Sequence, residues 1–268
     1  MYNQSEITTY LKKINYQGDN SVNLHNLRQL QYCHLLRIPY ENLSAMNGSP
    51  VLLDESSLYD KIISHDRGGY CFELQGLFYY LLKSLGYQVE QFAGRFMDEP
   101  GHIQMRRHRV LVMTLEGKRY VCDVGVRSES SRFPLELVED VIQSDCVGEY
   151  YYKKDPFYGW VQMQRLKGKD WKTILGFTEE KQIDDDYVMP SFYCEKHPDS
   201  TFNKFMKISI FTDKANLNIV GNEYRVFAEG RIQERRQIQN DTEARRILAE
   251  HFHIQVPPDY KKLLLEHT

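Results

Sequence analysis

The sequence has no long apolar run and no concentrated charge of one sign. No stretch of the 268 residues is apolar over enough length to cross a bilayer, and the opening residues, MYNQSEITTYLKK, lack the apolar core of a signal peptide. The formal net charge is −3 with acids and bases interspersed, unlike the basic surface of nucleic-acid-binding proteins. The one basic cluster, Arg231 to Arg236, is expected to be solvated. We therefore expect a cytoplasmic protein that binds neither membranes nor nucleic acid.

Cysteine is sparse and follows no pairing pattern. None of the five cysteines lies in a CxxC motif or near a histidine with the spacing of a zinc site. The five are Cys33, Cys71, Cys122, Cys146 and Cys194. This scatter argues against a disulfide framework and against a metal site. In a reducing compartment, a free thiol remains available for chemistry.

What the sequence does contain is a change of hydrophobic period near residue 86. Helical spacing over 5–13, 21–36 and 57–64, followed by the stretch from Arg67 to Gly86, predicts a helical bundle over 1–86. The next segment, 87–195, carries short β-branched and aromatic runs separated by turns, with a polar helical connector near its end. We expect this segment to be a central antiparallel β-barrel.

The last segment, 196–268, is expected to form a small mixed α/β unit. Strands are predicted over 204–212, 215–220 and 223–228, and a helix over 242–252 with Asp241 as its N-cap. The chain as a whole is therefore assigned to the α+β class, with a helical bundle, a barrel and an α/β end.

The stretch RGGYCFELQGLFYYLLKSLG, from Arg67 to Gly86, suggests a nucleophile. The apolar spacing from Leu74 onward predicts an amphipathic helix with one buried face, which places Cys71 in its first turn beside that face. Unpaired N–H groups at a helix start favour a thiolate. A free cysteine is, however, very often only a small core residue, and on the helix alone that interpretation is preferred.

A base for this thiol is predicted on the hairpin HRVLVMTL-EGK-RYVCDVG. If Glu116 and Gly117 form a two-residue turn, His108 and Asp123 lie on one face as diagonal neighbours, within reach of each other. A slip of one residue would separate them, so the inference depends on the turn. An unpaired carboxylate inside the apolar run VCDVG would be costly, which favours a partner for Asp123. His102, in the preceding loop, is the competing candidate base.

Four segments of the sequence resemble one protein family. RGGYCFELQGLF is similar to the RGGxCxELN motif of arylamine N-acetyltransferases, and IPYENL, HRVLVMTLEGKRYVCDVG and HPDSTF resemble other segments of that family in the same order. The resemblance implies that Cys71 is the acyl acceptor, His108 the base and Asp123 the residue that orients it. It also implies a helical bundle, a β-barrel and an α/β lid, with a cysteine-protease-like catalytic core between the first two.

The resemblance further implies an enzyme of xenobiotic metabolism. The family transfers an acetyl group from acetyl-coenzyme A to arylamines, arylhydroxylamines or hydrazines by double displacement, without a metal. Tyr40 and Phe96 are then expected to line the acceptor pocket, and His197 and Phe202 the coenzyme A side. Arg67 and Glu73 are expected to anchor the start of the helix.

Two positions depart from the family pattern. Gln75 stands where members usually have asparagine, and Gly125, Val126 and Arg127 replace a Gly-Phe-Gly-like run. The second change is expected to alter substrate preference, and Arg127 is hypothesised to meet an anionic group on the donor or acceptor. Two alternatives therefore stay open. One is the same acyl-cysteine chemistry with another donor or acceptor, as in an amide synthase or a thioester hydrolase; the other is a binding protein that has lost turnover.

Overall fold

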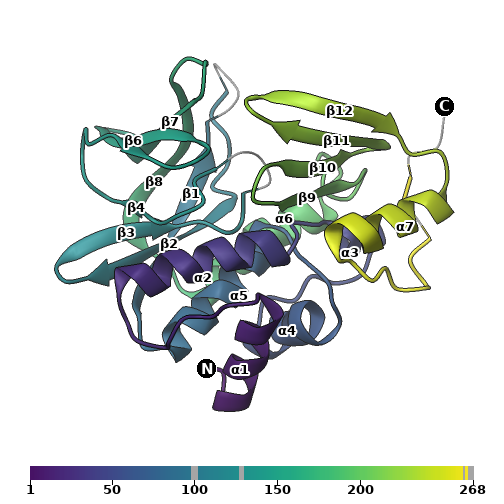
Figure 1. Cartoon of the computed structure of the whole chain (residues 1–268), viewed down its shortest axis with the longest axis horizontal. Coiled ribbons are helices and arrows are strands. Elements are labelled where there is room, and N and C mark those ends of the chain that lie inside the picture. The colour runs from purple at the N-terminus through teal and green to yellow at the C-terminus, as the bar shows by residue number, and fades with distance from the viewer. Residues whose placement is uncertain (98–101, 127–129, 262, 265–268) are drawn as a thin grey trace.

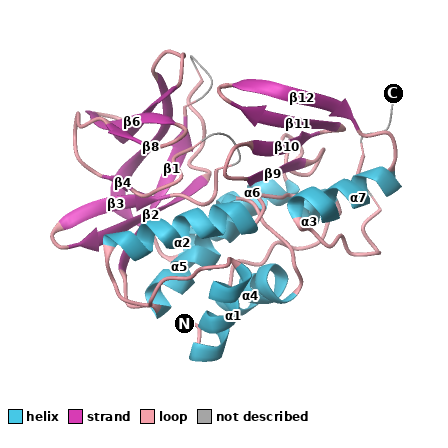
Figure 2. Cartoon of the chain, in the orientation of Figure 1, coloured by secondary structure: helices cyan, strands magenta, loops and turns pink. Residues whose placement is uncertain are grey.

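The computed structural model describes residues 1–97, 102–126, 130–261 and 263–264. Its helices gather below two separate sheets (Figures 1 and 2). Those that precede the first strand are α1 (Gln4–Lys13), α2 (Leu24–Arg37), α3 (Leu43–Met46), α4 (Glu55–Tyr59), the π-helical turn Asp60–Ser64 and α5 (Cys71–Ser84). The predicted N-terminal helices are confirmed, and the short helix α3 was missed. Within the described ranges, no helix is long and apolar enough to cross a membrane.

Helix α5 is the buried centre of the molecule. It ends at Ser84, and Gly86 follows with a φ of 93°, a conformation that suits glycine. The sequence predicted a single buried face, but Phe72, Gln75 and Gly76 on its other sides are also buried. The difference arises because α5 packs against α4 and against strands β1 and β2 of the barrel. A helix covered on several sides can hold polar residues in fixed positions.

The central segment forms an eight-stranded antiparallel sheet in the order β4-β3-β2-β1-β8-β7-β6-β5. Its strands are β1 (Gln88–Phe96), β2 (His108–Leu115), β3 (Lys118–Cys122), β4 (Leu135–Glu136), β5 (Gln143–Ser144), β6 (Gly148–Asp155), β7 (Gly159–Leu166) and β8 (Lys172–Lys181). The two edge strands approach each other, because the side chain of Gln143 on β5 bonds to both the backbone N–H and the carbonyl oxygen of Glu136 on β4. The predicted barrel is therefore confirmed, as a nearly closed one.

The β2–β3 hairpin has the predicted register. Leu115 pairs with Lys118 and Leu111 with Cys122. Glu116 and Gly117 form the turn with φ values of 51° and 76°, the left-handed pair that a tight hairpin requires. The register brings the N-terminal end of β2 beside the C-terminal end of β3.

The last segment forms a four-stranded sheet, β9 (Lys207–Phe211), β10 (Asn216–Val220), β11 (Glu223–Ala228) and β12 (Arg231–Gln237), covered by α7 (Asp241–Phe252). A short 3-10 turn (Asp184–Tyr187) and α6 (Val188–Lys196) connect it to the barrel, as predicted. The basic cluster at Arg231 is solvated as predicted, but it forms an edge strand that was missed. The predicted N-cap Asp241 was wrong: the N-cap of α7 is Asn240, whose side chain accepts the Glu243 N–H. The α+β class is confirmed.

The segment IPYENL joins these parts. Tyr40 forms a parallel bridge with Gly69, just before α5, and an antiparallel bridge with Ser209 on β9. The Tyr40 N–H donates to the Ser209 carbonyl oxygen at 2.8 Å, and the Ser209 N–H donates back at 2.9 Å. One short segment therefore touches both the start of α5 and the last sheet.

Candidate active site

Cys71 is the first residue of α5, where the helix start is held from several directions. Glu73 accepts the backbone N–H of Tyr70 at 3.0 Å, which completes half of a capping box. A Cβ on Gly68 would lie 2.0 Å from the carbonyl oxygen of Pro39, so only glycine allows this approach. The Cys71 thiol is almost fully buried and donates to the carbonyl oxygen of Arg107 at 3.4 Å.

The environment of Cys71 does not by itself favour a thiolate. Burial raises the pKa of the Cys71 thiol well above its ordinary value, and Cys194 and Asp123 act in the same direction. The Phe72 N–H and the Arg107 guanidinium lower that pKa, but burial outweighs them. The predicted effect of the helix start is therefore present but insufficient. Cys71 can ionise only if a nearby group accepts its proton.

His108 and Asp123 make the predicted contact. His108 Nε2 lies 2.7 Å from Asp123 Oδ2. A carboxylate can only accept, so Nε2 carries the hydrogen and Nδ1 is left with a lone pair. Nδ1 is buried and has no hydrogen-bond partner in the structure. The Cys71 thiol donates to the carbonyl oxygen of Arg107, which directly precedes His108, so Cys71 lies beside the start of β2.

Gln75 holds the end of the hairpin in place. Its side chain is fully buried, and Nε2 donates to the Arg109 carbonyl oxygen at 3.0 Å and to Asp123 Oδ1 at 3.1 Å, with the Cys122 carbonyl oxygen at 3.4 Å. Its Oε1 accepts the Val124 N–H at 3.2 Å. Gln75 therefore holds together the N-terminal end of β2, the C-terminal end of β3 and the carboxylate of Asp123.

We expect Gln75→Leu to lower the free energy of unfolding by about 1–3 kcal/mol, since it leaves buried backbone groups without partners. Denaturant unfolding would measure this. The matched control is Gln29→Leu on the exposed side of α2, for which the change should stay within about 0.5 kcal/mol. Equal effects of the two substitutions would contradict the anchoring role of Gln75.

Buried ion pairs anchor the start of α5. Arg67 Nη2 lies 2.7 Å from Glu41 Oε1, and Lys61 Nζ lies 2.6 Å from Glu73 Oε1. Arg67 and Glu73 thus have the predicted anchoring position, but each acts through a different partner.

Cys71 lines a cleft of about 570 Å³. Five of the predicted binding residues line it as well: Tyr40, Phe96, Gly125, Val126 and Phe202. Arg127 lies outside the described residues. His102 also borders the cleft, whereas His197 is not among its described lining residues and instead stacks on Tyr193, with ring centroids 4.3 Å apart.

Gly125 lies close to the start of α5, beside the nucleophile candidate. A Cβ there would lie 3.0 Å from Cys71 Cα, and its N–H donates to Asp123 Oδ1 at 2.9 Å. Glycine therefore allows the loop after β3 to pass directly over the start of α5. Arg107 also lines the cleft and was missed, because no local sequence pattern distinguishes it from Arg106.

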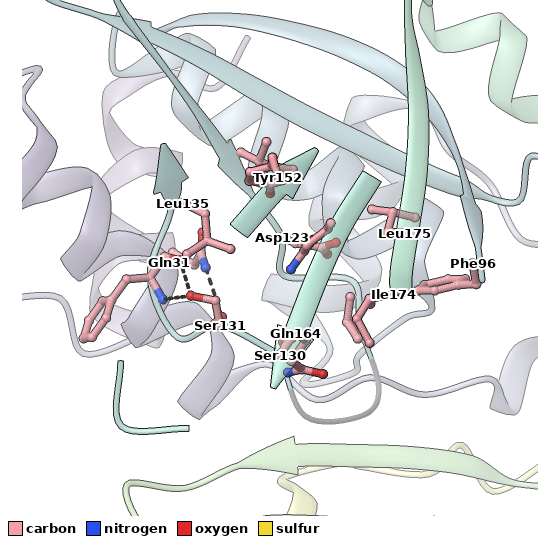
Figure 3. Close-up of a pocket in the computed structure, with 14 residues that line it drawn as sticks. Gln31, Phe96, Asp123, Ser130, Ser131, Leu135, Tyr152, Gln164, Ile174 and Leu175 are labelled. Atoms are coloured by element: carbon pink, nitrogen blue, oxygen red, sulfur yellow. Dashed lines mark hydrogen bonds between the residues drawn. The ribbon is translucent and has the colours of Figure 1, made fainter. Parts of the chain in front are cut away.

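A second cavity is lined by Asp123 and by residues of the barrel strands (Figure 3). Its volume is only about 20 Å³, room for about one water molecule. Three polar atoms that border it, Gln31 Oε1, Ser130 Oγ and Tyr152 OH, are buried without a partner in the structure. The size and these atoms fit a buried water rather than an organic ligand. Of these two cavities, the cleft at Cys71 is the one with room for a substrate.

The sequence matches a family model described as N-acetyltransferase over residues 23–260. An arylamine N-acetyltransferase of Escherichia coli (strain K12) is 30% identical over 245 residues, covering 91% of this chain and 86% of that protein. An arylamine N-acetyltransferase of Mycobacterium bovis is 34% identical over 233 residues, which cover 84% of this chain and 81% of that protein.

Solved structures agree with these sequence matches. The arylamine N-acetyltransferase from Salmonella typhimurium superposes with a TM-score of 0.88 at 26% identity, over 94% of this chain and 92% of that one. The Mycobacterium marinum enzyme in complex with CoA gives a TM-score of 0.85 at 29% identity, over 92% of each chain. On the matched length, the identity and the shared fold, this chain belongs to the arylamine N-acetyltransferase family.

Proposed function

We propose that this protein transfers an acetyl group from acetyl-coenzyme A to the nitrogen of an arylamine, arylhydroxylamine or hydrazine through an acetyl-Cys71 intermediate. The observation that carries the proposal is the His108–Asp123 hydrogen bond of 2.7 Å, which leaves Nδ1 of His108 buried and, among the described residues, without a hydrogen-bond partner. The Mycobacterium marinum relative with bound CoA supports the donor.

In the first half of the reaction, His108 Nδ1 takes the proton of Cys71. The sulfur then attacks the carbonyl carbon of the thioester, and the bond from that carbon to the coenzyme A sulfur breaks. The leaving thiolate receives the proton from His108. The negative charge on the carbonyl oxygen is proposed to face unpaired N–H groups in the first turn of α5.

In the second half, the acceptor nitrogen attacks the acetyl group on Cys71. His108 removes a proton from that nitrogen and returns it to the Cys71 sulfur as the thioester bond breaks. Asp123 holds the imidazole in the tautomer that can do this. Tyr40, Phe96 and Phe202 offer aromatic walls for the ring of the acceptor.

We also propose a division of labour along the chain. The helical segment 1–86 supplies the nucleophile and the barrel segment 87–195 supplies His108 and Asp123. The segment 196–268 acts as a lid, since Phe202 and Lys207 line the cleft. The cytoplasm is the proposed location, because it keeps thiols such as Cys71 reduced.

The test is to mix the protein with acetyl-coenzyme A alone and measure its intact mass. An acetyl adduct is expected on the wild type, absent in Cys71→Ala, and lost when an arylamine is added. Cys194→Ala, which removes another buried thiol, is the matched control and should retain the adduct. No wild-type adduct, or an adduct that persists in Cys71→Ala, would overturn the proposal. Loss of the adduct in water alone would indicate a thioester hydrolase.

A further inference from the structure

Arg107 presents a positive charge beside Cys71, and no carboxylate among the described residues forms an ion pair with it. We propose that Arg107 binds an anionic group of the acceptor, so that this enzyme prefers arylamines that carry a carboxylate, such as aminobenzoates. The inference rests on the proposed function and specifies its acceptor class.

The position of Arg107 is fixed by three observations. Its carbonyl oxygen receives the Cys71 thiol at 3.4 Å, and its side chain lines the same cleft as Cys71. Its Nη2 donates to Gln104 Oε1 at 2.8 Å, and Gln104 is nearly buried. A neutral amide therefore orients the guanidinium without cancelling its charge.

The neighbouring arginines differ from Arg107. Arg106 Nη1 lies 2.7 Å from Glu180 Oε2, and Arg109 Nη2 lies 2.7 Å from Asp184 Oδ1. Among the described residues, Arg107 has no acidic partner within 4.0 Å. Arg106 and Arg109 are therefore paired with carboxylates, whereas Arg107, which lines the cleft, has no acidic partner in the part of the chain that the structure describes.

A second cation, Lys207, also lines the cleft, and Asp199 is the one acidic side chain among its described lining residues. The Asp199 side chain is 83% exposed to solvent. A positively charged cleft with aromatic walls suits a planar, negatively charged ring.

The charge at Arg107 is better placed for the acceptor than for the donor. When the thioester of acetyl-coenzyme A reaches Cys71, the pantetheine arm holds the phosphates many bonds away. An aminobenzoate is short and rigid, so its carboxylate stays close to the amine that attacks acetyl-Cys71. A guanidinium can bind that carboxylate through two parallel hydrogen bonds.

The experiment compares 4-aminobenzoate with 4-aminobenzamide, which has nearly the same shape and no charge. The acetyl-enzyme is first formed from 4-nitrophenyl acetate, a donor without phosphates, and its deacetylation by each amine is then followed. We expect the wild type to prefer the carboxylate by about tenfold in second-order rate constant. Arg107→Gln should remove the preference and Arg107→Lys should retain part of it.

The control is Arg106→Gln, which removes a neighbouring charge that already has a partner and should keep the preference. No preference in the wild type, or one that survives in Arg107→Gln, would overturn the inference. The inference would also be overturned if Arg107→Gln slowed only the acetylation of Cys71 by acetyl-coenzyme A and left deacetylation unchanged. That result would assign Arg107 to the phosphates of the donor. An equal loss with both amines would make it a thiolate stabiliser instead. Failure to form any acetyl-enzyme would overturn the proposed function itself, a distinguishable result.

Discussion

Replacing Asp123 with asparagine is expected to lower kcat/KM for acetyl transfer by about 10⁴-fold without unfolding the protein. Asp123 Oδ1 accepts from Gln75 Nε2 and from the Gly125 N–H, at 3.1 and 2.9 Å. An asparagine must keep its oxygen toward these two donors, so its NH₂ group faces His108 Nε2. That nitrogen must then accept, which moves the ring proton to Nδ1. The imidazole can no longer take the proton of Cys71.

The measurement is the rate of acetyl-enzyme formation together with its pH profile and the melting temperature. Asp140→Asn is the matched control, since Asp140 is exposed and its φ of 56° also suits asparagine. The assigned role would be contradicted if Asp123→Asn acetylated within tenfold of the wild-type rate.

The second large effect is expected on stability. Glu41→Gln should lower the free energy of unfolding by about 3–5 kcal/mol, because it leaves the buried Arg67 guanidinium without its counter-charge. The Glu41 side chain is 0% exposed and that of Arg67 5%. Arg67 Nε and Nη2 both donate to Glu41 Oε1, at 3.0 and 2.7 Å, and Oε2 accepts the Leu43 N–H at 2.6 Å.

Thermal unfolding at neutral pH would measure this loss. The control is Glu180→Gln, which breaks the exposed pair with Arg106 and should cost at most about 1 kcal/mol. Similar losses for the two variants would contradict the prediction, since they would mean that burial of the Arg67 pair adds nothing.

The same pair gives a pH dependence. Burial raises the pKa of Glu41, but Arg67, Lys61 and the Leu43 N–H outweigh it and hold that pKa below its ordinary value. A carboxyl whose pKa is lowered on folding stabilises the protein above its unfolded-state pKa and loses this contribution as pH falls through the folded-state pKa. The difference in free energy of unfolding between wild type and Glu41→Gln should therefore be largest at neutral pH and become smaller as the pH falls into the acid range.

The contact between His108 and Asp123 could be predicted because it depends on local rules. A turn at Glu116 and Gly117 sets the register, and the register sets which side chains meet. The bonds of Gln75 could not be predicted, because they join a helix to two strand ends that are distant in sequence. The same limit applies to Tyr40, whose pairing with Ser209 depends on how separate segments assemble.

Other differences have identifiable causes. Strand β12 has charged side chains on both faces and no apolar alternation, so its sequence resembles a solvated loop. The burial of Gln75 and Gly76 on α5 reflects the barrel that surrounds the helix, which helical periodicity cannot reveal. Arg107 has no local signal of its own either, since only the folded cleft distinguishes it from Arg106.

The two bridges of Tyr40 have a consequence for cooperativity. The last sheet shares backbone hydrogen bonds with the segment that also borders the start of α5, so it cannot detach without disturbing the helix that carries Cys71. The amides of Tyr40, Glu41 and Ser209 therefore belong to a single unfolding unit and should exchange with solvent together, late, and close to the rate of global unfolding.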